Sequence, residues 1–431
     1  MLSSEPERPV PVRSEAVGRH WLIIVLGLAL ASGVAVSVIY LPQPLLAYVG
    51  AEFGASHAVA AWAATAAQFG YGIGVLLLVP VGEIRSPRRL VRIQFAVTAV
   101  IVLICAAAPQ LWLLCLILLI AGGAASVAQL LGPLAARLAP THQRENATAL
   151  IIAGLALGIF GGRVGAAIIA DMTGWRWVFV AAAVALLAMV LVLGVVVGAD
   201  LRPTTAILYK TLLGSLPGLF ARTGTLRAAS GYQFLAFSSF NAVWTVAALH
   251  LTERLGFTPI ETGLFALVGL FSAVLVPFTG TLMRATGHDT VRSMGFAIGA
   301  VSSVTLIVSP SHPIVLGAAL AGLAVMNFVV QVPNQVSIYD ATGDAGPRAN
   351  AIFIFFTFIG AAIGAEIGAV LYQYGTITAT GVFSLGMALL ALTALVIAQA
   401  FRIRGRRRMC VRRPLPAQIP SANQEPERVD R

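Results

Sequence analysis

The sequence predicts an all-α membrane protein in which twelve transmembrane helices form two related six-helix bundles. Of its 431 residues, 58% are hydrophobic and only 10% are charged. Mean hydropathy is +0.89, which is above what a soluble core requires. Because a bilayer core of about 30 Å is crossed by about 20 apolar residues, the apolar runs between residues 21 and 401 leave no room for a separate soluble catalytic domain.

Apolar runs separated by Pro, Gly or charged residues give the positions of the twelve spans. In the first half they are 21–41, 59–81, 90–107, 111–138, 147–170 and 175–197. In the second half they are 228–251, 262–283, 291–308, 313–338, 351–372 and 379–400. The expected divisions are a cytoplasmic tail (1–19), a first bundle (20–198), a basic connector (199–226), a second bundle (227–401) and a basic, disordered tail (402–431). An amphipathic piece at 207–213 in the connector is expected on the membrane surface.

The positions of the basic residues predict that both termini lie in the cytoplasm. In this orientation, 25 of the 28 Lys and Arg residues fall in cytoplasmic loops and tails, and Arg163, Arg176 and Arg254 do not. This is the positive-inside pattern of a bacterial inner-membrane protein, and it requires an even number of spans. The net charge of +11 is therefore expected to face anionic lipids, with no nucleic acid as a partner. A monomer is expected.

Internal repeats support the division into two halves. A shift of 200 residues aligns Ala121-Gly122 with Ala321-Gly322, Pro133 with Pro333 and Arg92 with Arg292, and a shift of 198 aligns Gly82 with Gly280. Such a duplicated six-helix unit allows two bundles to rock around a site at the membrane midplane. A shift of 203 aligns residues 161–165 with 364–368, which predicts that Arg163 and Glu366 occupy equivalent places.

Polar side chains recur on every third span, which predicts a central solvated path for a small-molecule substrate. The tenth span carries four amides at i, i+4, i+7 and i+8, on one helix face. The alternative is that the amides join helices by hydrogen bonds worth ~0.6–2 kcal/mol each, but the recurrence favours a path. The predicted substrate-binding residues on spans one, four, seven and ten are Tyr40, Gln43, Ser126, Gln129, Gln233, Asn241, Trp244, Asn327, Gln331, Asn334 and Gln335. Because the candidate residues on these spans carry no charge, the expected substrate is neutral or weakly polar, either sugar-like or drug-like.

Two ionisable residues lie within spans, Arg163 in the fifth and Glu366 in the eleventh. A charge at the bilayer centre costs ~2.5–3.5 kcal/mol on insertion scales, so both are candidates for proton coupling. The alternative is that both lie near the outer interface and reach water.

The sequence excludes several other functions. There is no P-loop, and Lys210 is the only lysine, so the chain itself does not hydrolyse ATP. Cys105, Cys115 and Cys410 lack metal-ligand spacing, and the six histidines are scattered and do not form a cluster with Asp or Glu at catalytic spacing, so neither a metal, a cofactor nor an enzyme is expected. A membrane receptor that transports nothing remains a remote alternative.

The loop after the second span resembles the loop-2-3 signature of the major facilitator superfamily, with Gly82-Glu83 followed by Arg88-Arg89. Residues 280–287 resemble its second copy. Residues 40–46, with Gly174-Trp175-Arg176, are similar to the bacterial arabinose-efflux-permease-like and drug–proton antiporter branch. The resemblance implies alternating access, a cavity lined by helices one, four, seven and ten, and a cytoplasmic gate at Gly82, Glu83, Arg88 and Arg89. It also implies efflux, with an uptake permease or facilitator as the alternative. Because the chain itself does not hydrolyse ATP, an ion gradient or the substrate's own gradient is expected to drive transport.

The chain departs from this family pattern at three places. Glu83 stands where the signature has Asp, and Met283 stands at the acidic position of the second copy. The glycines of the fifth span lack the proline of the antiporter signature.

Overall fold

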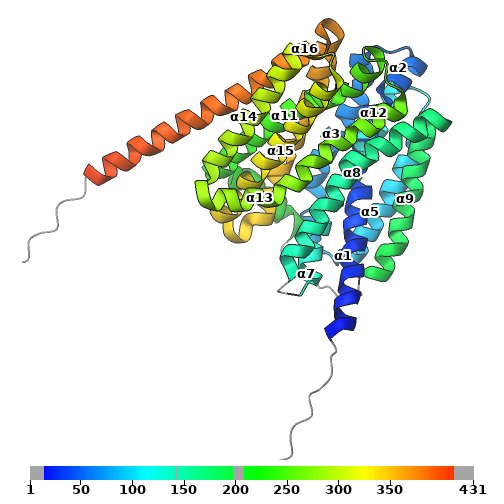
Figure 1. Cartoon of the computed structure of the whole chain (residues 1–431). Helices are drawn as coiled ribbons and strands as arrows, with labels where there is room; N and C mark the ends of the chain where they lie inside the picture. The colour runs from blue at the N-terminus through cyan, green and yellow to red at the C-terminus, as the bar shows by residue number, and fades with distance from the viewer. Residues whose placement is uncertain (1–13, 141–142, 198–207, 412–431) are drawn as a thin grey trace, which may run out of the picture.

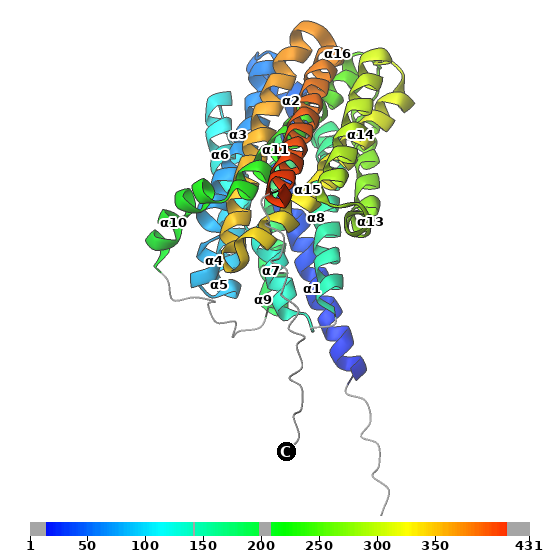
Figure 2. The same cartoon turned by 90° about the vertical axis from the view of Figure 1, so that its left-hand side faces the viewer.

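The computed structural model describes residues 14–140, 143–197 and 208–411, and within these residues it contains helices and connections but no strand. Figures 1 and 2 show long helices running side by side, with α1 projecting at one end and the last part of α16 projecting away from the bundle. Each predicted span coincides with helix over most of its length.

The first half contains α1 to α9. Its helices are α1 (Ser14–Ser37), η1 (Gln43–Leu45), α2 (Leu46–Phe53), α3 (His57–Leu78), α4 (Val81–Ile84), α5 (Pro87–Cys105), α6 (Leu111–Ala125), α7 (Ala128–Leu138), α8 (Arg144–Thr173) and α9 (Trp175–Val196). The fourth predicted span is therefore divided into α6 and α7. At this break, the backbone N–H groups of Ser126 and Val127 donate to the carbonyls three residues earlier, Gly123 and Ala124, instead of four residues earlier as in an α-helix.

The second half contains α10 to α16. Its helices are α10 (Tyr209–Arg222), α11 (Gly224–Glu253), α12 (Pro259–Phe265), η3 (Ala266–Leu270), α13 (Phe271–Thr286), α14 (His288–Val308), α15 (Pro313–Thr342), η4 (Gly343–Ala345) and α16 (Gly346–Val411). The eighth span is divided among α12, η3 and α13. Spans eleven and twelve are both part of α16, and they are separated by non-helical backbone at Gly375 and Thr376.

In the described part of the chain, seven helical segments are long and apolar enough to cross a bilayer. The last of them, Pro313–Ala400, contains spans ten, eleven and twelve. The other predicted spans are the shorter apolar segment Trp21–Ser37, the interrupted helix that includes Pro259–Leu270, and α5 with its three arginines. The protein is thus an all-α membrane protein with twelve spans in two six-helix halves.

Small residues bring helices into backbone contact within each half. Where α1 crosses α8, a Cβ atom on Gly154 would lie 2.2 Å from the carbonyl oxygen of Ala29, and one on Gly158 would lie 2.1 Å from that of Gly33. The crossing of α11 and α16 repeats this pattern in the second half. There, Cβ atoms on Gly360, Gly364 and Gly368 would lie 2.5, 2.2 and 2.3 Å from the carbonyl oxygens of Phe234, Ser238 and Ala242.

These two crossings correct the predicted alignment of the halves. Gly154, Gly158 and Gly162 contact α1 at four-residue intervals, as Gly360, Gly364 and Gly368 contact α11, so the structural shift is 206 and not 203. Arg163 therefore corresponds to Ala369, and its predicted equivalence with Glu366 is wrong. The error arose because both helices carry glycines at four-residue spacing, and the additional pair Gly161 and Gly165 allows a second match.

The two halves meet along two seams. At the first seam, α3 packs on α16, and the rings of Tyr71 and Phe358 lie 4.4 Å apart. At the second, α8 packs on α12 and η3, where a Cβ atom on Gly263 would lie 2.8 Å from the Cβ atom of Ala167. The polar residues of the candidate site lie between these seams.

Candidate substrate-binding site

The break after α1 carries the first two predicted site residues. Pro42 and Pro44 have no backbone N–H groups, so the helix cannot continue regularly through this segment. The chain instead turns after Ser37 and forms the short helix η1. This turn buries Tyr40 and Gln43, which are 1% and 2% exposed.

Gln43 links the two halves by hydrogen bonds from both ends of its amide. Its Nε2 donates to Asn241 Oδ1 (3.1 Å) and to Thr245 Oγ1 (3.2 Å) on α11. Its Oε1 accepts a bond from Arg163 Nε (2.8 Å) on α8. Asn241 Oδ1 also accepts from Gln68 Nε2 (3.0 Å) on α3, so three first-half segments converge on one second-half helix.

Arg163 lies at the centre of this site and is 4% exposed. Its guanidinium carbon is 4.4 Å from the ring centre of Tyr40, 5.2 Å from that of Trp244 and 5.5 Å from that of Phe160. Its Nη1 donates to the carbonyl of Ile159 (2.7 Å). Within the described residues, no carboxylate forms an ion pair with Arg163, and its Nη2 is buried without a hydrogen-bond partner.

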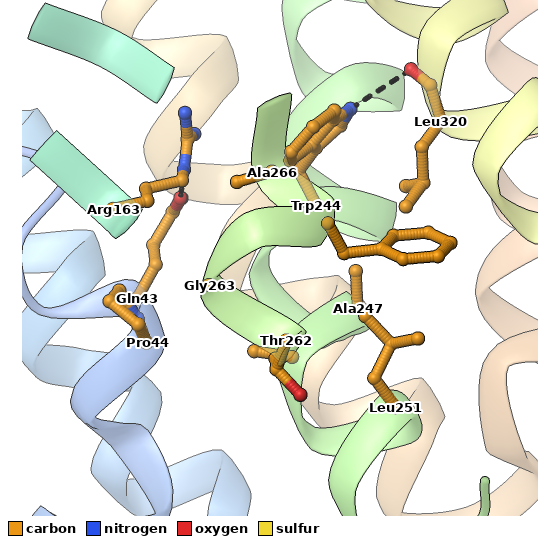
Figure 3. A pocket seen from close by; sticks show the side chains of 12 residues that line it. Gln43, Pro44, Arg163, Trp244, Ala247, Leu251, Thr262, Gly263, Ala266 and Leu320 are labelled. Atoms are coloured by element: carbon orange, nitrogen blue, oxygen red, sulfur yellow. Dashed lines mark hydrogen bonds between the residues drawn. The ribbon is translucent and has the colours of Figure 1, made fainter. Parts of the chain in front are cut away.

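A small cavity lies beside Arg163, with a volume of about 30 Å³, enough for one or two water molecules. Figure 3 shows Arg163 and Gln43 on one side of it and Trp244, whose Nε1 donates to the Leu320 carbonyl (3.3 Å), on the other. Thr262 also lines this cavity, and its buried hydroxyl has no partner among the described residues.

A second cavity of about 190 Å³ shares Gln43 and Thr262 with the first. It extends past Tyr48 on α2 and Thr252 at the end of α11. Because α2 lies at the end of the bundle opposite to the start of α1 (Figure 1), the site is connected to that end.

Three other predicted residues form a separate cluster in the second half. Gln233 Nε2 donates to Asn327 Oδ1 (3.0 Å), and Asn334 Nδ2 donates to Gln233 Oε1 (3.2 Å). Arg292 Nε donates to Asn334 Oδ1 (2.8 Å), and Arg292 also pairs with Asp289 (2.7 Å). These bonds join α11, α14 and α15. They agree with the alternative that the amides hold helices together by hydrogen bonds instead of lining a path.

The remaining predicted binding residues lie apart from both clusters. Gln129 Nε2 donates to the Tyr71 hydroxyl (2.9 Å), and Gln335 Nε2 donates to Asn350 Oδ1 (3.3 Å). Ser126 is fully buried and Gln331 is half-buried. The structure thus brings together Tyr40, Gln43, Asn241 and Trp244 around Arg163, but not the whole predicted set.

The predicted cytoplasmic gate residues lie around α4 and α5. A Cβ atom on Gly82 would lie 2.7 Å from Leu130 Cδ2, so α4 packs closely on α7. Arg88 Nη2 donates to the Gly194 carbonyl (2.7 Å) in the last turn of α9, where a cation is favourable. Arg89 is exposed, and the side chain of Glu83 lies outside the described residues.

Glu366 lies on the seam between α3 and α16. It is half-buried, and Thr65 Oγ1 donates to its Oε2 across the seam (3.4 Å). Arg163, in contrast, is only 4% exposed but lies beside a cavity large enough for one or two water molecules, so access of water to both residues stays an alternative prediction.

The sequence interpretation missed Gln68, Thr245 and Thr262. Gln68 is the only amide in α3 and is fully buried, a signal that could have identified it, because an isolated amide in an apolar span is costly without a partner. Thr245 lies one helical turn after Asn241 and shares its face. Threonines are common in membrane helices, and nothing in the sequence distinguishes Thr262.

Comparison with known proteins agrees with this architecture. Residues 25–215 and 229–421 match the family model described as "Major Facilitator Superfamily". The chain is 33% identical over 360 residues to "Uncharacterized transporter YgaY" of Escherichia coli O157:H7, covering 82% of this chain and 89% of that protein. It is 31% identical over 359 residues to "Probable transporter SCO4007" of Streptomyces coelicolor, covering 82% of each.

Two solved structures share the fold at low sequence identity. The nucleoside transporter NupG superposes with a TM-score of 0.67 at 13% identity, covering 87% of this chain and 99% of that one. The human organic anion transporter MFSD10 superposes with a TM-score of 0.65 at 16% identity, covering 88% and 99%. The chain therefore belongs to the major facilitator superfamily and is a multi-pass membrane transporter, not an enzyme.

Proposed function

We propose that this transporter exports a small molecule from the bacterial cytoplasm by alternating access and is driven by a proton gradient. The observation that carries the proposal is the chain of hydrogen bonds from Arg163 through Gln43 to Asn241, which crosses between the halves beside a buried cavity. A ligand at this place touches both bundles, so binding and bundle movement are coupled.

A row of aromatic rings supports the proposal that the cavity is closed on one side of the membrane. Tyr71, Phe358, Phe237, Phe240 and Trp244 follow one another with ring centres 4.4 to 5.6 Å apart. The row begins on α3, crosses α16 and continues along α11, and it lies on the side of the cavity away from the 190 Å³ extension. This conformation is therefore interpreted as closed toward the cytoplasm.

The direction of transport and the proposed orientation rest on sequence features. Export is proposed because residues 40–46 resemble those of efflux permeases, and cytoplasmic termini are proposed from the distribution of basic residues. In this orientation the basic loops face anionic lipids.

Glu366 is the proposed coupling residue. Its bond with Thr65 crosses the α3–α16 seam, so a change in its protonation changes a contact between the halves. Its side chain is half-buried. Arg163 is not proposed as a proton carrier, because a guanidinium stays protonated in proteins.

The expectation of a neutral substrate stays a prediction. It rested on the candidate residues of spans one, four, seven and ten, none of which is charged. The fifth span, however, contributes Arg163 to the cavity lining. The lining therefore carries a positive charge.

The proposal is tested with purified protein in liposomes that contain a pH-sensitive dye. An exporter coupled to protons moves protons against the direction of its substrate, so substrate addition changes the internal pH only in protein-containing vesicles. Substrate flux that does not change when a pH gradient is imposed indicates a facilitator. Proton movement in the same direction as the substrate indicates an uptake symporter. Absence of flux for every compound in a broad panel indicates a receptor.

A further inference from the structure

We infer that the cargo of this site is a small organic anion whose carboxylate binds Arg163. The inference rests on the proposed function, in which the cavity beside Arg163 holds the transported molecule.

No carboxylate among the described residues balances the charge of Arg163. It is buried, it lies in a membrane-spanning helix, and no carboxylate pairs with it within the described residues. The three surrounding rings stabilise a cation through their negatively charged faces, but they leave its net charge in place. A buried charge of this kind is costly unless a counter-charge or water reaches it.

Arg163 has a donor for that counter-charge beside the cavity. Its Nη2 is buried without a partner among the described residues, and Arg163 lines the 30 Å³ cavity. Thr262 lines the same cavity with a buried hydroxyl that also lacks a described partner, but this hydroxyl points away from Arg163 (Figure 3). A carboxylate has two acceptor oxygens and is small enough for this space, whereas a phosphate is bulkier. The apolar body of the anion would extend into the 190 Å³ cavity, past Ala47, Ala167 and Leu249.

The geometry of the guanidinium connects binding to the contact between the halves. Nε and Nη2 form one edge of the guanidinium, and carboxylates prefer to bind such an edge with two parallel hydrogen bonds. Nη2 has no partner in the part of the chain that the structure describes, but Nε donates to Gln43 Oε1. A carboxylate bound at this edge displaces Gln43, and this weakens the bonds from Gln43 to Asn241 and Thr245 in the other half.

Binding is measured by thermal unfolding of the purified full-length protein. The probes are three monocarboxylates (benzoate, phenylacetate and hexanoate) and their amides (benzamide, phenylacetamide and hexanamide), which have nearly the same shape without the charge. The variants are Arg163→Gln and Arg163→Lys. The control is Arg176→Gln, which removes a basic residue that pairs with Glu52 away from the cavity.

We expect at least one acid to bind the wild-type protein and the control about tenfold or more tightly than its amide does, the size expected for a hydrogen bond to a charged group. Arg163→Gln should lose this preference, and Arg163→Lys should retain part of it, because Lys keeps the charge without the planar edge. Arg163→Gln should also melt no lower than the control without ligand, since it removes an unbalanced buried charge.

Three results would overturn the inference. The acids and their amides bind equally, none of the acids binds, or Arg163→Gln keeps the full preference for the acids. A large loss of stability in Arg163→Gln without ligand would also contradict it, because Arg163 would then be a structural residue. The liposome assay separates this failure from failure of the proposed function: flux of neutral compounds without acid preference refutes only the anion, whereas absence of all flux refutes transport.

Discussion

The crossing of α1 and α8 offers a direct test of how the site is held. We predict that Gly158→Ala destabilises the protein and impairs transport, whereas Gly161→Ala on the same helix does neither. Gly158 faces the backbone of α1, and Gly161 has no atom within 4 Å of the position of an added Cβ. The two variants add the same methyl group to the same helix, so they differ only in what it meets.

The magnitude follows from the separation of the helices. A Cβ atom on Gly158 would lie 2.1 Å from the carbonyl oxygen and 2.5 Å from the Cα atom of Gly33, where ordinary contacts begin at 3.4 Å. Both neighbouring atoms belong to the backbone, so no side chain can rotate away, and the helices must separate by about 1 Å. Overpacking of this kind costs ~1–3 kcal/mol, while Gly161→Ala should gain up to ~1 kcal/mol from helix propensity.

The assay is an SDS-unfolding titration of both variants beside the wild-type protein, combined with transport in liposomes. Gly158→Ala should shift the unfolding midpoint to lower SDS, and it should also reduce flux, because α1 leads to Gln43 and α8 carries Arg163. Equal midpoints for the two variants would refute the backbone contact. A destabilised variant with full flux would refute its role in positioning the site.

Three further predictions concern other contacts. Asn241→Ala should reduce transport about tenfold or more without loss of membrane insertion, because it removes the acceptor of Gln68 and leaves a buried amide unsatisfied at ~1–3 kcal/mol; flux equal to the wild type would contradict this. Glu366→Gln should abolish the effect of an imposed pH gradient on flux, and an unchanged response would exclude Glu366 as the coupling residue. Arg88→Ala should lower the free energy of unfolding by ~0.3–1 kcal/mol through loss of its contact with the end of α9, and the exposed Arg89, when changed to Ala, should serve as a neutral control.

Much of the fold was predictable from the sequence because the bilayer imposes it. Apolar length fixes where helices lie, and basic residues fix which loops share a side. The interruptions were less accessible: the apolar run 262–283 shows no sign of η3, and the run 111–138 shows little of the break between α6 and α7. Backbone geometry at such points depends on neighbouring helices, which hydropathy does not describe.

The candidate site was predicted only in part, for a reason that lies in the chemistry of amides. An amide stripe on a helix shows that partners are needed, but not whether they are a substrate or other amides. Gln233, Asn327 and Asn334 satisfy one another, whereas Gln43 connects to Arg163. The position of Arg163 in the cavity lining was missed because the two halves were aligned by glycines that match at two different shifts.

The helix crossings within each half are packed differently from the seams between the halves, and this difference determines where the helices can move relative to one another. Within each half, a Cβ atom added to a glycine at the helix crossings would lie 2.1 to 2.5 Å from a backbone oxygen of the neighbouring helix. Such backbone contacts have no side-chain rotamers that could change. Across the seams, a Cβ atom on Gly72 would lie 3.3 Å from Phe355 O and Phe358 Cβ. One on Gly269 would meet the ring of Phe160, and one on Gly263 would lie 2.8 Å from Ala167 Cβ, so the nearest contacts there include side-chain atoms. Aromatic rings and amides can turn without moving a helix axis, so each half can act as a rigid lever while the joint between them slides by shear.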